Sequence, residues 1–161
     1  MATFKFKGVN ELIAQYEKLD RDADKMIGKA IYNGAAVVMD SVKSSVDGIT
    51  TDDRFGTPDN PTAGPSTIQK IGLQHALGIA KLRNDNGFRN VKIGFDGYNS
   101  VHTKTWPNGQ PNMMVARSIE SGTSWMQKQP FMRRAEQAAR SGCEQAMSDT
   151  IDKEIKRIVN G

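Results

Sequence analysis

The chain has 161 residues, of which 37% are hydrophobic and 25% are charged. This length fits one domain with its own core, and the composition is that of a soluble protein whose core is lean. The formal net charge of +4 excludes the dense basic stripe that is typical of a nucleic-acid reader.

The positive excess lies in the middle of the chain, where residues 48–129 carry nine basic and six acidic groups without a Lys/Arg run. We interpret it mainly as a solvated surface that leaves room for a passing contact with DNA. The single cysteine, Cys143, excludes an internal disulfide, and its apolar helical position predicts a small buried side chain. Because no stretch has the length of a signal-peptide core or a membrane span, we expect use in the cytosol or in an assembly made there, without membrane contact.

The N-terminal part predicts a short strand followed by one long helix. Residues 4–7 alternate apolar and polar side chains, as a half-buried strand does. Over residues 9–46, apolar side chains recur at three- and four-residue steps, which predicts an amphipathic helix. Such a helix would be about 57 Å long. We therefore expect a bend near Gly28 or Gly34 and contact between the overhanging part and a neighbour.

The middle of the chain predicts a loop and then a hairpin. Residues 47–66 are rich in Gly, Pro, Thr and Asp without periodicity, so a long functional loop is expected. The type of the short element at 68–79 stays open. Residues 78–83 and 90–95 are typical of strands, and the Asn-Gly turn within 84–87 predicts that they form a hairpin.

The last third predicts a second loop, a third strand and a final helix. The loop covers 96–112, and residues 113–121 are expected to add a strand antiparallel to the hairpin. The helix should begin at Pro130, whose missing N–H is harmless in a first turn, with a possible kink at 141–142. The expected fold is α+β in a single domain over residues 1–161: one antiparallel sheet of about three to four strands, packed by the long N-terminal helix and the C-terminal helix, with two long loops.

Catalytic and metal-binding patterns are weak. His75 and His102 lack companions at ligand spacing, which disfavours zinc and Ser/His chemistry. Asp52, Asp53 and Asp59 lack the spacing of a calcium loop and favour an acidic turn. The glycines around them lack the Gly-Lys-Ser/Thr of a phosphate loop. We expect no enzyme, no metal and no cofactor, and a small hydrolase is the weakest interpretation.

Three segments of the chain carry a resemblance to one family. The third segment is the most specific, because it has the order Glu-x-Gly-Thr, a short crossing, and Pro-Phe-Met-Arg. The chain resembles the tail-completion, or head–tail joining, proteins of long-tailed bacteriophages and prophages, which are minor tail or neck components. Ser121 stands where the family has an aromatic residue, and Arg134 stands where proline is common. The matching segments are Lys7-Gly-Val-Asn-Glu-Leu-Ile13, Leu77-Gly-Ile-Ala-Lys-Leu-Arg83 with Val91-Lys-Ile-Gly-Phe95, and Ile119-Glu-Ser-Gly-Thr123 with Gln129-Pro-Phe-Met-Arg133-Arg-Ala135.

The resemblance implies a structural virion protein that completes the tail end and joins it to the head connector. It implies a homo-oligomeric ring, a hexamer by family analogy, with head-connector and tail-tube proteins as partners. The protein would be located in the phage tail or neck, and in the host cytoplasm during assembly. The alternative from the residues themselves is a nucleic-acid-binding protein that uses the central basic excess.

The third segment supplies the candidate interface or motif residues. We expect Gly122 to adopt positive φ or a close approach, Thr123 to form a hydrogen bond across its turn, and Phe131 to anchor the last helix on the sheet. We expect Glu120 to face outward at a strand end, where it could pair with an arginine of its own chain or of another subunit. The candidates are Glu120, Gly122, Thr123, Pro130, Phe131, Arg133 and Arg134.

Overall fold

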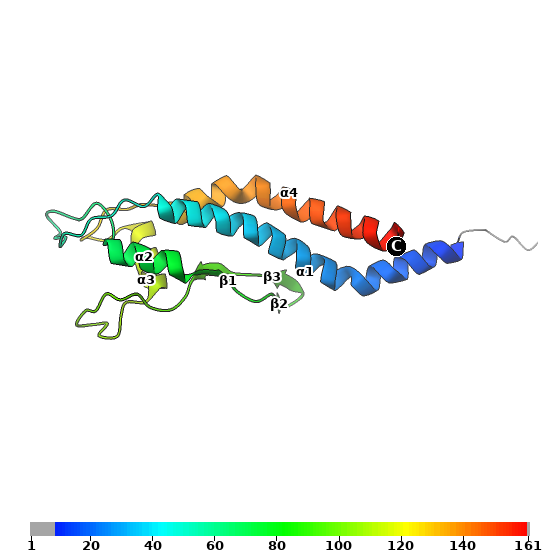
Figure 1. Ribbon diagram of the computed structural model, residues 1–161, viewed down its shortest axis with the longest axis horizontal. Coiled ribbons are helices and arrows are strands. Elements are labelled where there is room, and N and C mark those ends of the chain that lie inside the picture. Colours follow the sequence, from blue (N-terminus) through cyan, green and yellow to red (C-terminus); the bar gives the residue numbers. More distant parts are fainter. Residues whose placement is uncertain (1–8, 161) are drawn as a thin grey trace, which may run out of the picture.

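The computed structural model describes residues 9–160 of the chain, and two long helices set its elongated shape (Figure 1). Helix α1 spans Val9–Asp47 and helix α4 spans Phe131–Asn160. They run antiparallel, side by side, and form the most extensive contact between elements. Both predicted long helices are therefore confirmed. The strand expected at 4–7 lies outside the described residues.

Small residues allow the two long helices to approach closely. A Cβ atom added to Gly34 would lie 2.6 Å from Cγ of Met147 and 3.0 Å from Sγ of Cys143. Cys143 is half-buried in this contact, not fully buried as expected. Helix α1 continues without interruption through Gly28 and Gly34, and it changes direction in its first half (Figure 1). The close approach explains the glycine at position 34 better than a break in the helix does.

The predicted hairpin is confirmed, and it is divided into two short ladders. Strand β1 (Leu77–Ile79) pairs with β4 (Ile93–Phe95), and β2 (Arg83–Asp85) pairs with β3 (Phe88–Asn90), both antiparallel. Asn86 and Gly87 have φ values of 54° and 88°, which is the combination that a type I′ turn requires. The α+β class is thus confirmed with two two-stranded sheets.

The strand expected at 113–121 is wrong, because this segment is helix α3, Asn112–Ser121. Its buried residues are spaced three, four and seven positions after Asn112, which is the repeat of a helix face and not of a strand. The segment also contains two Met, one Ala and one Arg, which favour helix. The hairpin therefore gains no third strand, and α3 packs against β4 instead. The buried residues of α3 are Asn112, Val115, Ala116 and Ile119.

The element left open at 68–79 is helix α2, Thr67–Ala76, followed directly by β1. The Ser66 hydroxyl accepts a hydrogen bond from Gln69 N at 3.3 Å, and Gln69 Oε1 accepts one from Ser66 N at 2.9 Å. This reciprocal capping box satisfies two backbone donors at the start of the helix. It fixes the point at which the 47–66 loop ends.

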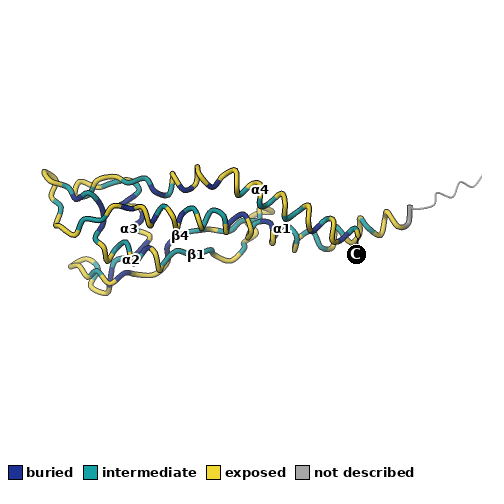
Figure 2. The backbone as a smooth tube through the Cα atoms, turned by 45° about the horizontal axis from the view of Figure 1, so that its top comes forward, coloured by how far each residue is buried: buried dark blue, intermediate teal, exposed yellow. Residues whose placement is uncertain are grey.

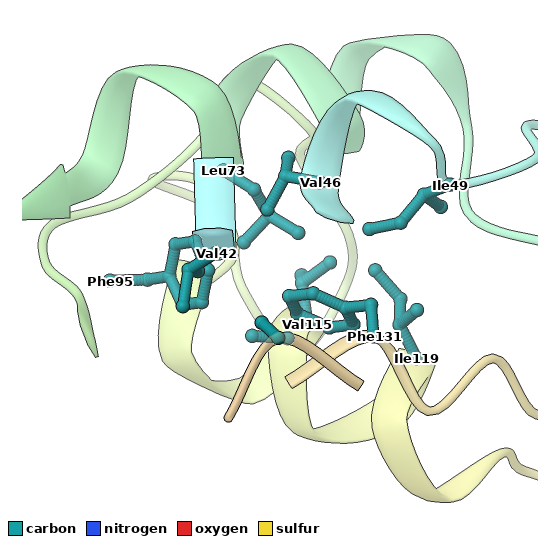
Figure 3. Close-up of a cluster of buried hydrophobic side chains, with 10 residues drawn as sticks. Val42, Val46, Ile49, Leu73, Phe95, Val115, Ile119 and Phe131 are labelled. Atoms are coloured by element: carbon teal, nitrogen blue, oxygen red, sulfur yellow. The ribbon is translucent and has the colours of Figure 1, made fainter. Parts of the chain in front are cut away.

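The hydrophobic core lies where all four helices meet the hairpin (Figure 3). Phe95 of β4 and Phe131 of α4 form a tilted aromatic pair with ring centroids 5.9 Å apart. Phe131 is only 3% exposed, so its predicted role as the anchor of the last helix is confirmed. The side chains around this pair are Val42, Val46, Ile49, Leu73, Val115, Ala116, Ile119 and Ala135. This cluster therefore occupies the half of the molecule next to the long loops, and buried residues continue along the two long helices (Figure 2).

Candidate functional site

The seven candidate residues lie in one joint, residues 120–134, which connects α3 to α4. Gly122 ends α3 with a φ of 74°, and its N–H donates to Ser118 O at 2.8 Å. The predicted positive φ is therefore confirmed. Thr123 N donates to Met126 O at 2.9 Å, and the Thr123 hydroxyl accepts from Trp125 N at 3.2 Å. The predicted hydrogen bonds across this turn are confirmed as well.

Glu120 caps the start of α4, which corrects the expectation of an outward-facing strand end. It sits in the last turn of α3, and its Oε2 accepts from Met132 N at 2.8 Å while Oε1 accepts from Arg133 N at 3.2 Å. A carboxylate at this position satisfies backbone donors that have no partner within the helix and interacts favourably with the helix dipole. The prediction is wrong because 113–121 belongs to helix α3 and not to the expected strand.

Arg133 and Arg134 do not pair with Glu120. Among the ion pairs within residues 9–160, none involves either arginine, and both side chains are exposed. The helix begins at Phe131, one residue after the expected start, and Pro130 is its N-cap residue, whose carbonyl accepts from Arg134 N at 3.3 Å. The two guanidinium groups thus face solvent from a helix start whose position is fixed internally.

Gln129 ties the joint to the 47–66 loop, a role that the sequence reasoning missed. Its Nε2 donates to the carbonyls of Thr50 and Ala63, both at 2.9 Å, and its Oε1 accepts from Thr50 N at 2.9 Å. Gly64 permits this arrangement, because an added Cβ would collide with Thr50 O and lie 2.5 Å from Gln129 Nε2. The sequence feature that could have indicated this role is the position of Gln129 directly before Pro130-Phe131, at the start of α4.

A second connection runs beside the first. Thr62 N donates to Trp125 O at 2.9 Å, and Gln127 N donates to Thr62 O at 2.8 Å, which forms a parallel bridge between loop and joint. Gly56 fits directly against the backbone of Trp125, where a Cβ atom would clash. The loop and the joint therefore form one hydrogen-bonded frame, although neither contains a regular strand.

The predicted acidic turn in the loop is confirmed, and its carboxylates accept hydrogen bonds from other residues of the chain. The Arg54 side chain donates two hydrogen bonds to Asp52, at 2.6 and 3.0 Å, Arg54 N donates a third at 3.2 Å, and Ala63 N donates a fourth at 2.9 Å. The hydrogen bonds from the Arg54 side chain hold the pKa of Asp52 well below its ordinary value. Asp53 accepts from the N–H and the hydroxyl of Thr67, at 2.7 and 2.8 Å, at the start of α2.

The frame carries exposed apolar side chains at the end of the molecule where the loops gather (Figure 1). Phe55 is completely exposed, and Trp125 is 55% exposed. Both line an open cleft of about 780 Å³ together with Ile68, Met114 and Met126. We call this surface the loop-end surface. Exposed aromatic side chains on a rigid backbone are typical of contact surfaces for other proteins.

The remaining candidate groups show simple local contacts. His102 Nδ1 lies 2.6 Å from Pro107 O, and His75 is exposed on α2. In residues 9–160, no cluster of three or more His, Cys, Asp or Glu side chains is arranged to hold a metal ion. No helix in the same range combines the length and the apolar content needed to cross a membrane.

The fold and the site define an elongated α+β protein with an exposed apolar surface on loops that are hydrogen-bonded to each other. No protein-family model, no curated protein and no solved structure matches the chain. Its function is therefore argued from its own residues and from the resemblance given above.

Proposed function

We propose that the protein is a structural subunit of a phage virion that completes the tail end and joins it to the head connector as a homo-oligomeric ring. The carrying observation is that the residues of the resemblance have one shared task. Glu120, Gly122 and Thr123 fix the turns of the joint, and Gln129 holds the 47–66 loop against it. What this frame presents outward is Phe55 and Trp125, a surface suited to another protein.

The alternative, a nucleic-acid-binding protein, receives less support from the placement of the cations. Of the nine basic residues in 48–129, three are engaged within the chain. Arg54 pairs with Asp52, Arg89 pairs with Asp24 at 2.6 Å, and the Lys70 ammonium donates to two backbone carbonyls. DNA contact is therefore proposed only as a passing contact during assembly.

Native mass spectrometry over a concentration series tests the ring. We expect a closed species near six times the 17.7 kDa chain, in exchange with smaller forms. The double variant Phe55→Ser, Trp125→Ser should lose that species while it keeps the unfolding temperature of the parent. Phe88→Ser is the matched control, because Phe88 is 78% exposed but lies on the hairpin at a distance from the loops.

The joining role is tested by adding the purified protein to tails and filled heads that were produced without it. Restored joining by the parent but not by the Phe55→Ser, Trp125→Ser variant supports the proposal. A protein that never exceeds the monomer mass and restores nothing would overturn it. DNA binding that weakens steeply with salt, without joining activity, would favour the alternative.

A further inference from the structure

The first half of α1 carries a regular coiled-coil seam. Its apolar residues alternate between steps of three and four, the spacing of positions a and d in a heptad repeat. The seam continues without change of period over three heptads. Its members are Val9, Leu12, Tyr16, Leu19, Ala23, Met26 and Ala30.

Helix α4 covers only the second part of this seam. Lys29 Nζ donates to Glu154 at 2.8 Å, and Asn33 Nδ2 donates to the Thr150 hydroxyl at 2.8 Å. This antiparallel register places Asn160, the last residue of α4, opposite Ala23. Consistent with that, Ala30 is 1% exposed, whereas the seam before Ala23 extends past the end of α4 (Figure 1).

The uncovered part of the seam is strongly exposed. Leu12 is 51% exposed and Tyr16 66%, and Ile13, which lies beside the seam, is 49% exposed. Leu12 and Tyr16 lie on the face that continues the α1–α4 interface, with Ile13 at its edge. In Figure 2, no element of residues 9–160 covers this region. Helix α4 removes the second part of the seam from water. The first part can be removed from water only if another helix packs on it.

We propose that the first turns of α1, residues 9–19, pair antiparallel with the same segment of a second copy of the chain. The pairing does not depend on the proposed ring, because it uses the end of the molecule opposite to the loop-end surface. It is isologous, since the same residues contribute from both copies around a two-fold axis.

The residues beside the seam favour the antiparallel over the parallel orientation. In an antiparallel pair, flanking positions of the same kind face each other across the axis, so Ile13 of one copy meets Ile13 of the other and is buried. In a parallel pair, Asp20 and Asp22 of both copies would lie at the same height and repel each other. A pair centred near residue 14 separates the two Asp20 residues by about 18 Å along the helices.

The uncovered segment is short, so the contact is weak and depends on concentration. Sedimentation equilibrium of the full chain should show a monomer–dimer component with a dissociation constant in about the micromolar range or weaker. The variant Leu12→Glu, Tyr16→Glu should weaken that component at least about tenfold, because four added charges would face each other in the pair. Ile71→Glu is the matched control, since Ile71 is 46% exposed on α2, away from α1's first turns.

Site-specific cross-linking tests the orientation. In a Cys143→Ser background, Ile13→Cys should be linked between copies by a short bis-maleimide. Ala14→Cys, one residue on and pointing away from the seam, should be linked at least about tenfold less. The proposal is overturned if the Leu12→Glu, Tyr16→Glu variant sediments like the parent, or if both cysteines react equally. Loss of the ring by loop-end variants leaves this result unaffected, so the two proposals fail separately.

Discussion

Removing the Glu120 cap gives the sharpest test of the joint. The carboxylate accepts from Met132 N and Arg133 N at the start of α4. In Glu120→Ala both donors lose their partner, and helix-cap losses of this kind cost about 0.5–2 kcal/mol, with a further 0.3–1 kcal/mol from the lost charge at the helix N-terminus. We expect the free energy of unfolding to fall by about 1–3 kcal/mol. Glu120→Gln keeps one acceptor and should cost about half of that.

Urea unfolding followed by circular dichroism measures this effect. The midpoint should fall while the slope of free energy against urea stays constant, because the same surface is exposed on unfolding. Glu144→Gln is the control: Glu144 is exposed and forms a loose pair with Arg140 at 3.7 Å, so its change should stay within about 0.5 kcal/mol. If Glu120→Ala unfolds like the parent and yet fails to assemble, Glu120 acts between subunits and the cap argument is wrong.

Three further predictions concern the same half of the molecule. Phe131→Ala should cost about 3–5 kcal/mol in urea unfolding, because it leaves a cavity in the core beside Phe95; a loss below about 1 kcal/mol would contradict its core role. Gly64→Ala should speed proteolytic cleavage within 47–66 at least about tenfold, since the new methyl group collides with Thr50 O and separates loop from joint; unchanged cleavage would show that the frame yields elsewhere. Asp52 has a lowered pKa in the folded protein, so its contribution to stability is present above the ordinary carboxyl pKa and is lost as pH falls below it. Asp52→Asn should therefore flatten the loss of stability between about pH 5 and pH 2, measured by thermal unfolding at each pH.

The sequence predicted what depends on long-range periodicity and on strong turn signals. The apolar stripe over 9–46, the helix after Pro130 and the Asn86-Gly87 turn each correspond to a sequence pattern that is specific to one type of structure. The error at 113–121 has a clear cause. The segment is only ten residues long and follows a predicted hairpin and loop, which favours a further strand, whereas the spacing of Asn112, Val115 and Ile119 places them on one helical face. Short segments of this kind are decided by packing, which sequence patterns describe poorly.

The candidate site divides in the same way. Gly122 and Thr123 were predicted because their conformations are local properties of a turn. The roles of Glu120 and Gln129 depend on backbone atoms that belong to other segments, and Gln129 reaches Thr50 across 79 positions of sequence. A side chain that binds the backbone imposes no complementary residue type on its partner. No sequence pattern in the 47–66 loop could therefore have predicted this contact. The contact between Asp53 and Thr67 is weakly indicated, because an acidic residue and a threonine are a matched pair for a side-chain hydrogen bond.

The hydrogen bonds of the joint separate the residues that stabilise the protein's own structure from those that are available to contact a partner. Glu120, Gly122, Thr123 and Gln129 use their polar groups or their backbone conformation inside the chain, so little of their chemistry remains for a partner. Phe55 differs, since its whole side chain faces solvent from a loop that Gln129 bonds to the joint. A resemblance carried by the joint therefore indicates a common framework. Partner choice would rest on the loop-end side chains, which can change without disturbing the frame, and substitutions there should alter assembly while leaving stability within about 0.5 kcal/mol of the parent.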